Sequence, residues 1–420
     1  MDAPSFSGLL IVVAVAFAVP FTLGLLPRLR LPAVVLEIVL GIVIGPAVLG
    51  WVEIDTTISV IAVVGLVFLL FLAGLEIEFE HLRGRVLRLT AGAWLASFAI
   101  AVAIGYALKA GGLVQTPLLV AVILSATSLG VIIPVLKDAG EIATPLGRYV
   151  IAGGTIADFG AIILLSLLFT GEGGGTTSTL LLIGALLAMA FAVYLVVTQA
   201  ERSRRVTEDL RRLQDTTAQI RVRGAIVVLI AFAALAENLG LEVILGAFAA
   251  GAVLTLVDRD RYMTHPLFRT KLDAIGYGFF IPVFFVASGV RFDLDALLSS
   301  MDALVKVPVF LLALLAIRGL PALAYRADIG ARRTAVAALF QATSLPFVVA
   351  ATAIGLELGL IGGGEAAALV AAGLLSLLLF PLAGLTILRG GGADGAAGAS
   401  ELGDRDVAVG PDGQRAAAVQ

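Results

Sequence analysis

Apolar residues along this chain form blocks of about 20, the length at which a helix crosses the ~30 Å hydrocarbon core of a bilayer. Short segments between the blocks hold most of the charged residues. The first block has no basic residue before it and is longer than the apolar part of a signal peptide, so we count it as a spanning helix. The pattern predicts thirteen membrane helices, at residues 5–26, 31–50, 57–75, 89–108, 117–136, 149–170, 180–197, 224–239, 241–257, 275–290, 304–325, 334–355 and 366–388.

Lys and Arg residues fall almost entirely in alternate loops between these blocks. Their largest cluster lies at 202–223, whereas the opposite set of loops holds only Lys109, Arg291 and Lys306. Because basic loops face the cytoplasm, this predicts a multi-pass protein of the cell (plasma or inner) membrane, with the N-terminus outside and the C-terminus inside. Residues 389–420 are rich in Gly, Ala and Asp, which predicts a disordered cytoplasmic tail.

The composition excludes several classes of protein. Hydrophobic residues make up 60% of the chain and charged residues 14%, far from the balance of a soluble domain. The net charge of −3 gives no sign of a nucleic-acid partner, so the bilayer is the expected surroundings. The absence of cysteine rules out disulfides and thiolate metal sites, and no motif indicates a cofactor or an enzyme.

Short stretches of the first half recur in the second half, in the same order and at similar spacing. They are residues 36–41 with 241–246, the run ending at Gly74 with the run ending at Gly289, and Ala-Thr-Ser-Leu at 126–129 and 342–345.

These matches place a first repeat at 5–170, a linker helix at 180–197 and a second repeat at 224–388, all within a transmembrane domain at 1–388. The shift is an odd number of spans, so paired helices run in opposite directions across the membrane. Inverted repeats of this kind are typical of secondary transporters, whose site lies near the midplane between the halves. The predicted fold is therefore an all-α polytopic membrane protein with two six-helix inverted-topology repeats.

Two charged residues, Asp158 and Arg318, lie well inside predicted spans, whereas Glu37 lies in the cytoplasmic third of its span. A charge at the centre of a membrane helix costs at least about 2.5–3.5 kcal/mol, so such residues are usually functional. One alternative is that the two form a salt bridge that only holds their helices together. The interpretation we favour is that Asp158 binds a monovalent cation or a proton in turn, with Arg318 as its charge partner.

Hydroxyl residues lie at the centres of two further spans, the Thr-Ser pairs at 127–128 and 343–344, beside Gly130, Pro134 and Pro346. They have two interpretations: hydroxyls that only pack helices together, or two helices that break and cross beside Asp158 and offer it oxygen atoms. On the second interpretation the ion- and proton-binding residues are Asp158, Thr127, Ser128, Thr155, Thr343 and Ser344, and the transported cation binds at Asp158.

The same stretches resemble the cation:proton antiporter superfamily, most closely its Kef-type branch with a sodium/hydrogen exchanger-like membrane domain. The resemblance rests on Leu-Glu-Ile-Val-Leu-Gly from residue 36, Leu-Phe-Leu-Ala-Gly-Leu-Glu from residue 70, and Ser-Ala-Thr from residue 125. Asp158 matches the ion-binding aspartate, and Arg318 matches a basic residue that is usually lysine.

The resemblance implies antiport of Na⁺ or K⁺ against H⁺ by a homodimer. It implies a core of predicted helices 4–6 and 11–13, with broken helices 5 and 12, that moves like an elevator against the other helices. One departure matters: members commonly have Asp, Asn or Gln before the ion-binding aspartate, and this chain has Ala157. A single titrating carboxylate predicts electroneutral exchange. The alternatives are a sodium-coupled symporter of an organic anion, and a channel or sensor that never alternates access.

Overall fold

The computed structural model describes residues 6–25, 32–75, 84–168, 219–238, 243–257, 267–298 and 300–403, together with the helical positions 184, 188, 191 and 195. These residues form helices joined by short turns, with no strand among them. Most of the predicted linker helix, 180–197, lies outside the described residues.

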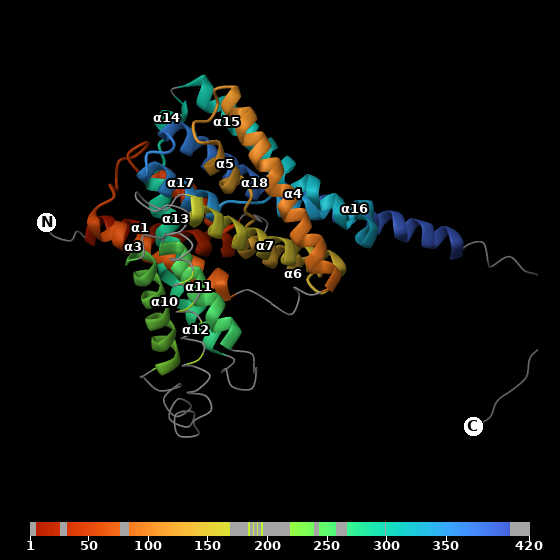
Figure 1. The fold of residues 1–420 in the computed structure, drawn as a ribbon, viewed down its shortest axis with the longest axis horizontal. Coiled ribbons are helices and arrows are strands. Elements are labelled where there is room, and N and C mark those ends of the chain that lie inside the picture. Colours follow the sequence, from red (N-terminus) through yellow and green to blue (C-terminus); the bar gives the residue numbers. More distant parts are fainter. Residues whose placement is uncertain are drawn as a thin grey trace, which may run out of the picture.

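The helices divide into two groups by their packing (Figure 1). The scaffold group comprises α1 (Phe6–Leu25), α2 (Ala33–Ile44), α3 (Thr56–Leu75), α10 (Ile220–Asn238), α11 (Val243–Val257), α12 (Leu267–Ile275), the π-helical turn η1 (Gly276–Phe280) and α13 (Ile281–Val290).

The remaining elements form the core group. It comprises α4 (Gly84–Ala110), α5 (Pro117–Leu124), α6 (Leu129–Asp138), α7 (Pro145–Leu168), α14 (Leu294–Leu298), α15 (Met301–Leu314), the π-helical η2 (Leu315–Gly319), the 3₁₀-helical η3 (Leu320–Tyr325), α16 (Arg326–Gln341), α17 (Pro346–Glu357) and α18 (Gly363–Gly403).

Glycines bring the scaffold helices into backbone contact. A Cβ added at Gly289 of α13 would lie 2.1 Å from the carbonyl oxygen of Ile38 in α2, and one at Gly251 of α11 would lie 2.1 Å from that of Phe71 in α3. Small residues at such contacts are what allow membrane helices to pack closely, because no hydrophobic effect drives association inside lipid. Main-chain contacts at these glycines therefore help to hold the scaffold group together.

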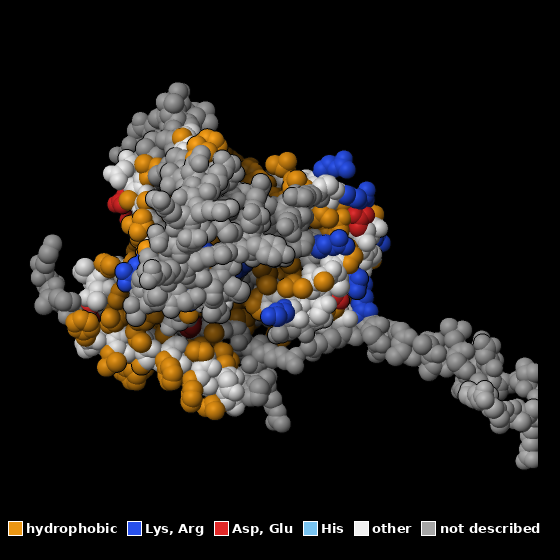
Figure 2. All heavy atoms as spheres, turned by 90° about the horizontal axis from the view of Figure 1, so that it is seen from below, with side chains coloured by type: hydrophobic (Ala, Val, Ile, Leu, Met, Phe, Trp, Pro, Cys, Tyr) orange, Lys and Arg blue, Asp and Glu red, His pale blue; other side chains and the backbone are white. Residues whose placement is uncertain are grey.

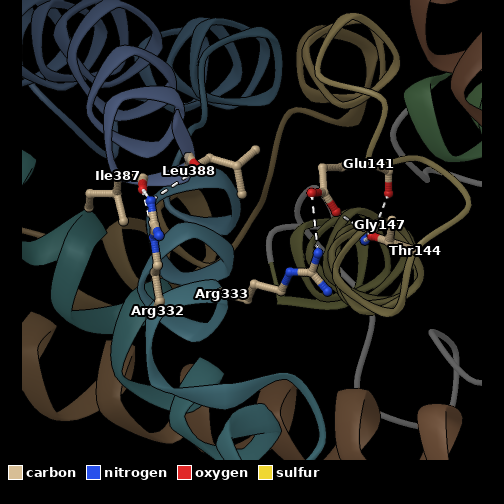
Figure 3. A network of polar contacts seen from close by, with 7 residues as sticks. All are labelled: Glu141, Thr144, Gly147, Arg332, Arg333, Ile387 and Leu388. Atoms are coloured by element: carbon tan, nitrogen blue, oxygen red, sulfur yellow. Dashed lines mark hydrogen bonds and ion pairs between the residues drawn. The ribbon is translucent and has the colours of Figure 1, made fainter. Parts of the chain in front are cut away.

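The core group has a different kind of link at the end where α16 begins. Figure 3 shows two neighbouring arginines of α16 that point in different directions. Arg332 donates from Nε to the carbonyl oxygen of Ile387 in α18 (2.8 Å), and Arg333 contacts Glu141, 3.5 Å from Nη2 to Oε1, in the turn before α7. These contacts tie α16 to α18 and to the start of α7.

Basic side chains are also gathered on the surface. Figure 2 shows most of the visible Lys and Arg side chains toward one side, while apolar side chains cover much of the rest of that face. The exposed basic residues at this end of the core group are Arg85, Arg88, Lys137, Arg148, Arg326 and Arg332. Such segregation fits helices that cross a bilayer and leave their charges on one side of it.

Eight helical stretches among the described residues are long and apolar enough to cross a membrane. Two of the predicted spans, near 33–44 and 243–255, are shorter apolar helices, and two others fall in one helical stretch from Met301 to Glu357. The structure thus has the character of a multi-pass membrane protein, while the count of thirteen and the inverted repeat remain predictions.

Two boundaries differ clearly from the prediction. The tenth predicted helix, 275–290, begins earlier, because α12 starts at Leu267 and carries Arg269, Lys271 and Asp273, whose charges made the segment resemble a loop. α18 runs to Gly403, beyond the predicted helix end at residue 388, while the disordered tail at 389–420 remains a prediction. Extending an existing helix needs no new nucleus, so even a Gly-rich segment can follow it. Residues 404–420 lie outside the described part of the chain.

Candidate ion-binding site

The fifth predicted helix is interrupted at residues 125–128, between α5 and α6. The hydroxyl of Ser125 donates to the carbonyl oxygen of Val122, 2.8 Å away, inside the last turn of α5. Serine hydroxyls that bond to nearby backbone groups compete with the helical ladder. The interruption falls where the sequence predicts it, at Thr127.

The twelfth predicted helix is interrupted at residues 342–345, between α16 and α17. Pro346 opens α17, a position where its missing N–H costs nothing. Proline also disfavours helical geometry in the residue before it, and Leu345 has φ −143° and ψ −57°. The sequence therefore explains this break directly.

The two breaks lie against each other and exchange hydrogen bonds. The backbone N–H of Ser128 donates to the carbonyl oxygen of Thr343 (2.9 Å), and the N–H of Leu345 donates to the hydroxyl of Ser128 (2.8 Å). Backbone groups inside a membrane protein must find partners within the protein. Each interrupted helix therefore supplies partners for the other, which keeps irregular backbone stable at this depth.

Arg318 lies in the π-helical turn η2 and is 2% exposed. It donates to the hydroxyl oxygen of Thr127 from Nε (3.0 Å) and Nη2 (2.8 Å), and to that of Ser97 in α4 from Nη1 (3.1 Å). The Thr127 hydroxyl in turn donates to the carbonyl oxygen of Gln341 (2.7 Å). A buried charge is tolerated only when hydrogen bonds replace its lost hydration, and these contacts do so here.

Asp158 of α7 reaches the same threonine from the other side. Its Oδ1 accepts a hydrogen bond from the backbone N–H of Thr127, at 3.2 Å. Thr127 thus stands between the carboxylate and the guanidinium of Arg318, binding one by its backbone and the other by its side chain. The two charges are also close enough to interact electrostatically.

Asp158 faces a cavity of about 80 Å³ between the two helix groups. Scaffold residues from α3, α11 and η1 form one wall, and the broken helices with α7 form the other. The lining residues are Leu69, Leu70, Ala73, Thr127, Ser128, Leu129, Gly130, Thr155, Asp158, Ile162, Phe248, Tyr277, Pro346 and Phe347. The volume suits a small ion with a few oxygen ligands better than an organic molecule.

The structure brings together four of the residues predicted to bind the ion or proton. Those that line the cavity are Thr127, Ser128, Thr155 and Asp158.

Thr343 and Ser344 belong to the second break but do not line this cavity. The Thr343 hydroxyl donates to the carbonyl oxygen of Leu339 (3.1 Å), and the Ser344 N–H donates to the hydroxyl of Ser376 in α18 (3.1 Å). The Thr343 hydroxyl thus bonds within α16, and the backbone of Ser344 contacts α18. This break contributes to the site through the carbonyl oxygen of Thr343, which accepts a hydrogen bond from the backbone N–H of Ser128.

Sequence reasoning missed three residues around Arg318. Ser97 accepts from Nη1, and the carbonyl oxygen of Gly153 lies 3.4 Å from Nη2. The side-chain amide of Gln341 donates to the carbonyl oxygen of Tyr149 (3.2 Å). A Cβ at Gly153 would lie 2.3 Å from Nε2 of Gln341, so glycine makes room for that amide. The sequence signal for this group was Ser97, a single serine in the apolar part of α4.

Comparison with known proteins identifies the family. The profile described as "Sodium/hydrogen exchanger, transmembrane" matches residues 13–389, which is most of the chain. The chain belongs to the sodium/hydrogen exchanger family. Members of this family are transporters rather than enzymes, in agreement with the sequence analysis. The superfamily prediction is thereby confirmed, and the assignment to its Kef-type branch remains a prediction.

Three relatives of this exchanger-family chain show the range of similarity. YjbQ of Bacillus subtilis, named as a candidate Na⁺/H⁺ antiporter, is 31% identical over 91% of this chain and 63% of its own length. The chain thus spans slightly less than two thirds of that relative. The Na⁺/H⁺-K⁺ antiporter GerN of Bacillus cereus is 28% identical over 64% of this chain and 68% of its own. Cation/H⁺ antiporter 19 of Arabidopsis thaliana is 28% identical over 69% of this chain and 38% of its own length.

Solved structures agree on the fold. The structure of the sodium proton antiporter MjNhaP1 from Methanocaldococcus jannaschii at pH 8 superposes with a TM-score of 0.63, covering 91% of this chain and 98% of that chain. An electron-microscopy structure of the same antiporter gives a TM-score of 0.65. Identity is 16% in both cases, so this likeness concerns the fold alone.

Proposed function

We propose that this protein exchanges a monovalent cation for a proton at Asp158. The observation that carries the proposal is the place of this carboxylate, in a cavity between the two helix groups and beside two interrupted helices. Relatives named as Na⁺/H⁺ antiporters make Na⁺ the first candidate, and the name of GerN adds K⁺. The cavity gives no support to the organic-anion symporter considered above.

Asp158 alternates in this mechanism between a proton and a cation. Its neighbour Ala157 offers no second carboxylate, so each cycle carries one positive charge in either direction. Ser128 and Thr155 line the same cavity and offer hydroxyl oxygens to a bound cation. Arg318 stays charged throughout, because a guanidinium does not deprotonate in proteins. It holds Thr127 in place and limits how strongly the site favours positive charge.

The two helix groups provide the alternating access. The Asp158 cavity touches the C-terminal half of α3, at Leu69 and Ala73. A second cavity, of about 500 Å³, touches the N-terminal half of α3 at Ala62 and Leu66, and the far half of α17. The cavities therefore lie toward opposite ends of α3. Movement of the core group along the scaffold group would expose Asp158 first to one side and then to the other, as an elevator does.

Orientation and assembly complete the proposal. The basic loops favour an N-terminus outside and a C-terminus in the cytoplasm, in a cell membrane. The Asp158 cavity then opens toward the cytoplasmic half. We expect a homodimer formed through the scaffold group, where α1 exposes Phe17 and Phe21. The inverted repeat is supported by the two breaks, which meet at Ser128 and Thr343.

Asp158→Asn tests this function most directly. Asparagine keeps the shape and polarity of the side chain but holds neither a titrating proton nor a negative charge. We expect cation-dependent proton movement in proteoliposomes to fall to the level of empty liposomes for both Na⁺ and K⁺.

Asp295→Asn is the matched control, because Asp295 is an exposed aspartate in α14, away from the cavity. It should retain exchange. If Asp158→Asn exchanges cations as fast as Asp295→Asn, the ion site lies elsewhere.

A further inference from the structure

The scaffold group contains one buried charged residue that the exchange mechanism does not use. Glu37 of α2 is 4% exposed. Among the described residues it has no hydrogen-bond or ion-pair partner, in contrast with Arg318, which has several. An ionised carboxylate buried without partners is far more costly than a protonated one.

The helices around Glu37 offer it no compensating charge. α2 packs against α13 and α1, and neither helix contains an acidic, basic, histidine or tyrosine residue. The nearest charge in sequence to α13 is Arg291, which follows its far end and donates to the hydroxyl of Ser59 (2.8 Å). The carboxyl group is therefore surrounded by apolar helices.

Glu37 also lies beside the tightest contact between α2 and α13. Gly41 follows it by one helical turn on the same face. A Cβ at Gly41 would lie 2.2 Å from the carbonyl oxygen of Val286, and Ile38, next to Glu37, touches Gly289 in the same way. With these backbones in contact Glu37 is only 4% exposed, so little water can solvate an ionised carboxylate there. Ionisation and the close packing of α2 on α13 therefore oppose each other.

We propose that Glu37 is a second proton-binding site, separate from Asp158, which is occupied while α2 is packed against α13. Its ligand is the proton alone, since the described surroundings hold no cluster of oxygen ligands for a cation. If the core group moves as proposed above, this proton stays with the scaffold and is not carried across the membrane. Loss of the proton at alkaline pH loosens the α2–α13 contact, which makes the site a pH sensor in the scaffold group.

The first test detects the proton itself, without transport. Infrared difference spectra between about pH 5 and pH 9, chosen to bracket the ordinary range of a shifted carboxyl group, are recorded on Asp158→Asn protein. In this background Asp158 cannot contribute. We expect a band from a protonated carboxyl group in apolar surroundings that is lost at the higher pH. The buried Glu365 of α18 is unchanged in both proteins, so the Glu37 band is the part lost in the Asp158→Asn, Glu37→Gln double variant. Bands of equal size in the two proteins would overturn the proposal.

The second test measures the packing. Because the folded state binds this proton more tightly than the unfolded state, its stability falls as pH rises, by up to about ten-fold in the folding equilibrium per pH unit for one proton. The thermal unfolding midpoints of wild type and Glu37→Gln should coincide at acid pH, and the wild type should fall below the variant at alkaline pH. Glu53→Gln, an exposed glutamate just after α2, is the control and should follow the wild type. A constant difference between wild type and Glu37→Gln at every pH would contradict a titrating Glu37, whatever the outcome for exchange.

Discussion

The two helix groups are built from the same few apolar residues but differ in their buried polar side chains and in what their glycines contact. Among the described residues, every buried polar or charged side chain except Glu37 belongs to the core group. Glycines differ as well. In the scaffold, an added Cβ at Gly65 or Gly74 would lie within 2.3 Å of a backbone oxygen. In the core, one at Gly153 or Gly160 would meet a side chain, the amide of Gln341 or the ring of Trp94.

This difference separates a rigid surface from an adaptable one. Backbones in direct contact cannot move apart without losing many contacts at once, so the scaffold group is suited to stay still. At Gly153 and Gly160 the core group packs side chains against glycine, and it spreads polar contacts through Thr127; such side chains can shift by rotation about single bonds. A transporter needs both properties, because one part must hold its place while the other binds and releases an ion.

After Asp158 itself, the largest effect should come from Arg318, where the core depends on polar contacts. Arg318→Ala removes the donors to Thr127 and Ser97 and leaves Asp158 without a nearby cation. Each charge-assisted hydrogen bond contributes about 1.5–3 kcal/mol, so we expect exchange to fall about 10- to 100-fold. Initial rates in proteoliposomes measure this loss.

Arg318→Lys is the matched variant, since it keeps the charge but cannot make the same fork of contacts. It should recover part of the rate. Ser97→Ala removes one acceptor and should fall between wild type and Arg318→Ala. If Arg318→Ala exchanges at the wild-type rate, the polar network is not what holds the ion site in place.

The scaffold should respond to added volume instead. Gly289→Ala places a methyl group 2.1 Å from the carbonyl oxygen of Ile38, which cannot rotate away. We expect a loss of about 1–3 kcal/mol in stability, typical of overpacking, measured by thermal unfolding in detergent. Gly24→Ala in α1 meets nothing within 4 Å and should be neutral.

Gly153→Ala sharpens the comparison, because the atom in its way belongs to a side chain. The amide of Gln341 can turn aside at the loss of its bond to Tyr149, worth about 1 kcal/mol. A smaller loss of stability than for Gly289→Ala is therefore expected. Equal losses in the two variants would remove the distinction between the groups.

The sequence alone located the two breaks and the two central charges. Pro346 signals the second break, because it disfavours helix just before it. The repeated Ala-Thr-Ser-Leu then points to the first break, where no proline opens α6. Asp158 and Arg318 were found because each is isolated in an apolar span, and the cost of charge in lipid makes such residues informative.

The contacts between these residues could not be read from the sequence. Hydroxyl groups fit apolar helices in many orientations, so nothing in the pattern says that Thr127 faces Arg318 while Thr343 bonds within its own helix. The π-helical turn at Arg318 also changes which residues share a face, and it has no sequence signature here. Ser97 lies far from Arg318 in the chain, and only the packing of α4 brings it near.

The smallest effect is expected from the membrane potential, which should leave the equilibrium Na⁺ distribution unchanged. This tests whether the core group carries net charge across the membrane. In the proposed mechanism Asp158 holds one proton or one monovalent cation and Arg318 cannot release a proton, so one-for-one exchange would move no net charge across the membrane. An electrogenic cycle would instead gain or lose about 2.3 kcal/mol per charge for each 100 mV.

A clamped potential is imposed on proteoliposomes with valinomycin, with Na⁺ as substrate, and the equilibrium Na⁺ distribution is recorded. We expect that distribution to follow the pH gradient alone. Initial rates are a weaker measure, because a voltage-sensitive step can occur within a neutral cycle. A distribution that shifts with the potential would mean that a second charge crosses with the core group, and the carrier of that charge would have to be sought beyond Asp158.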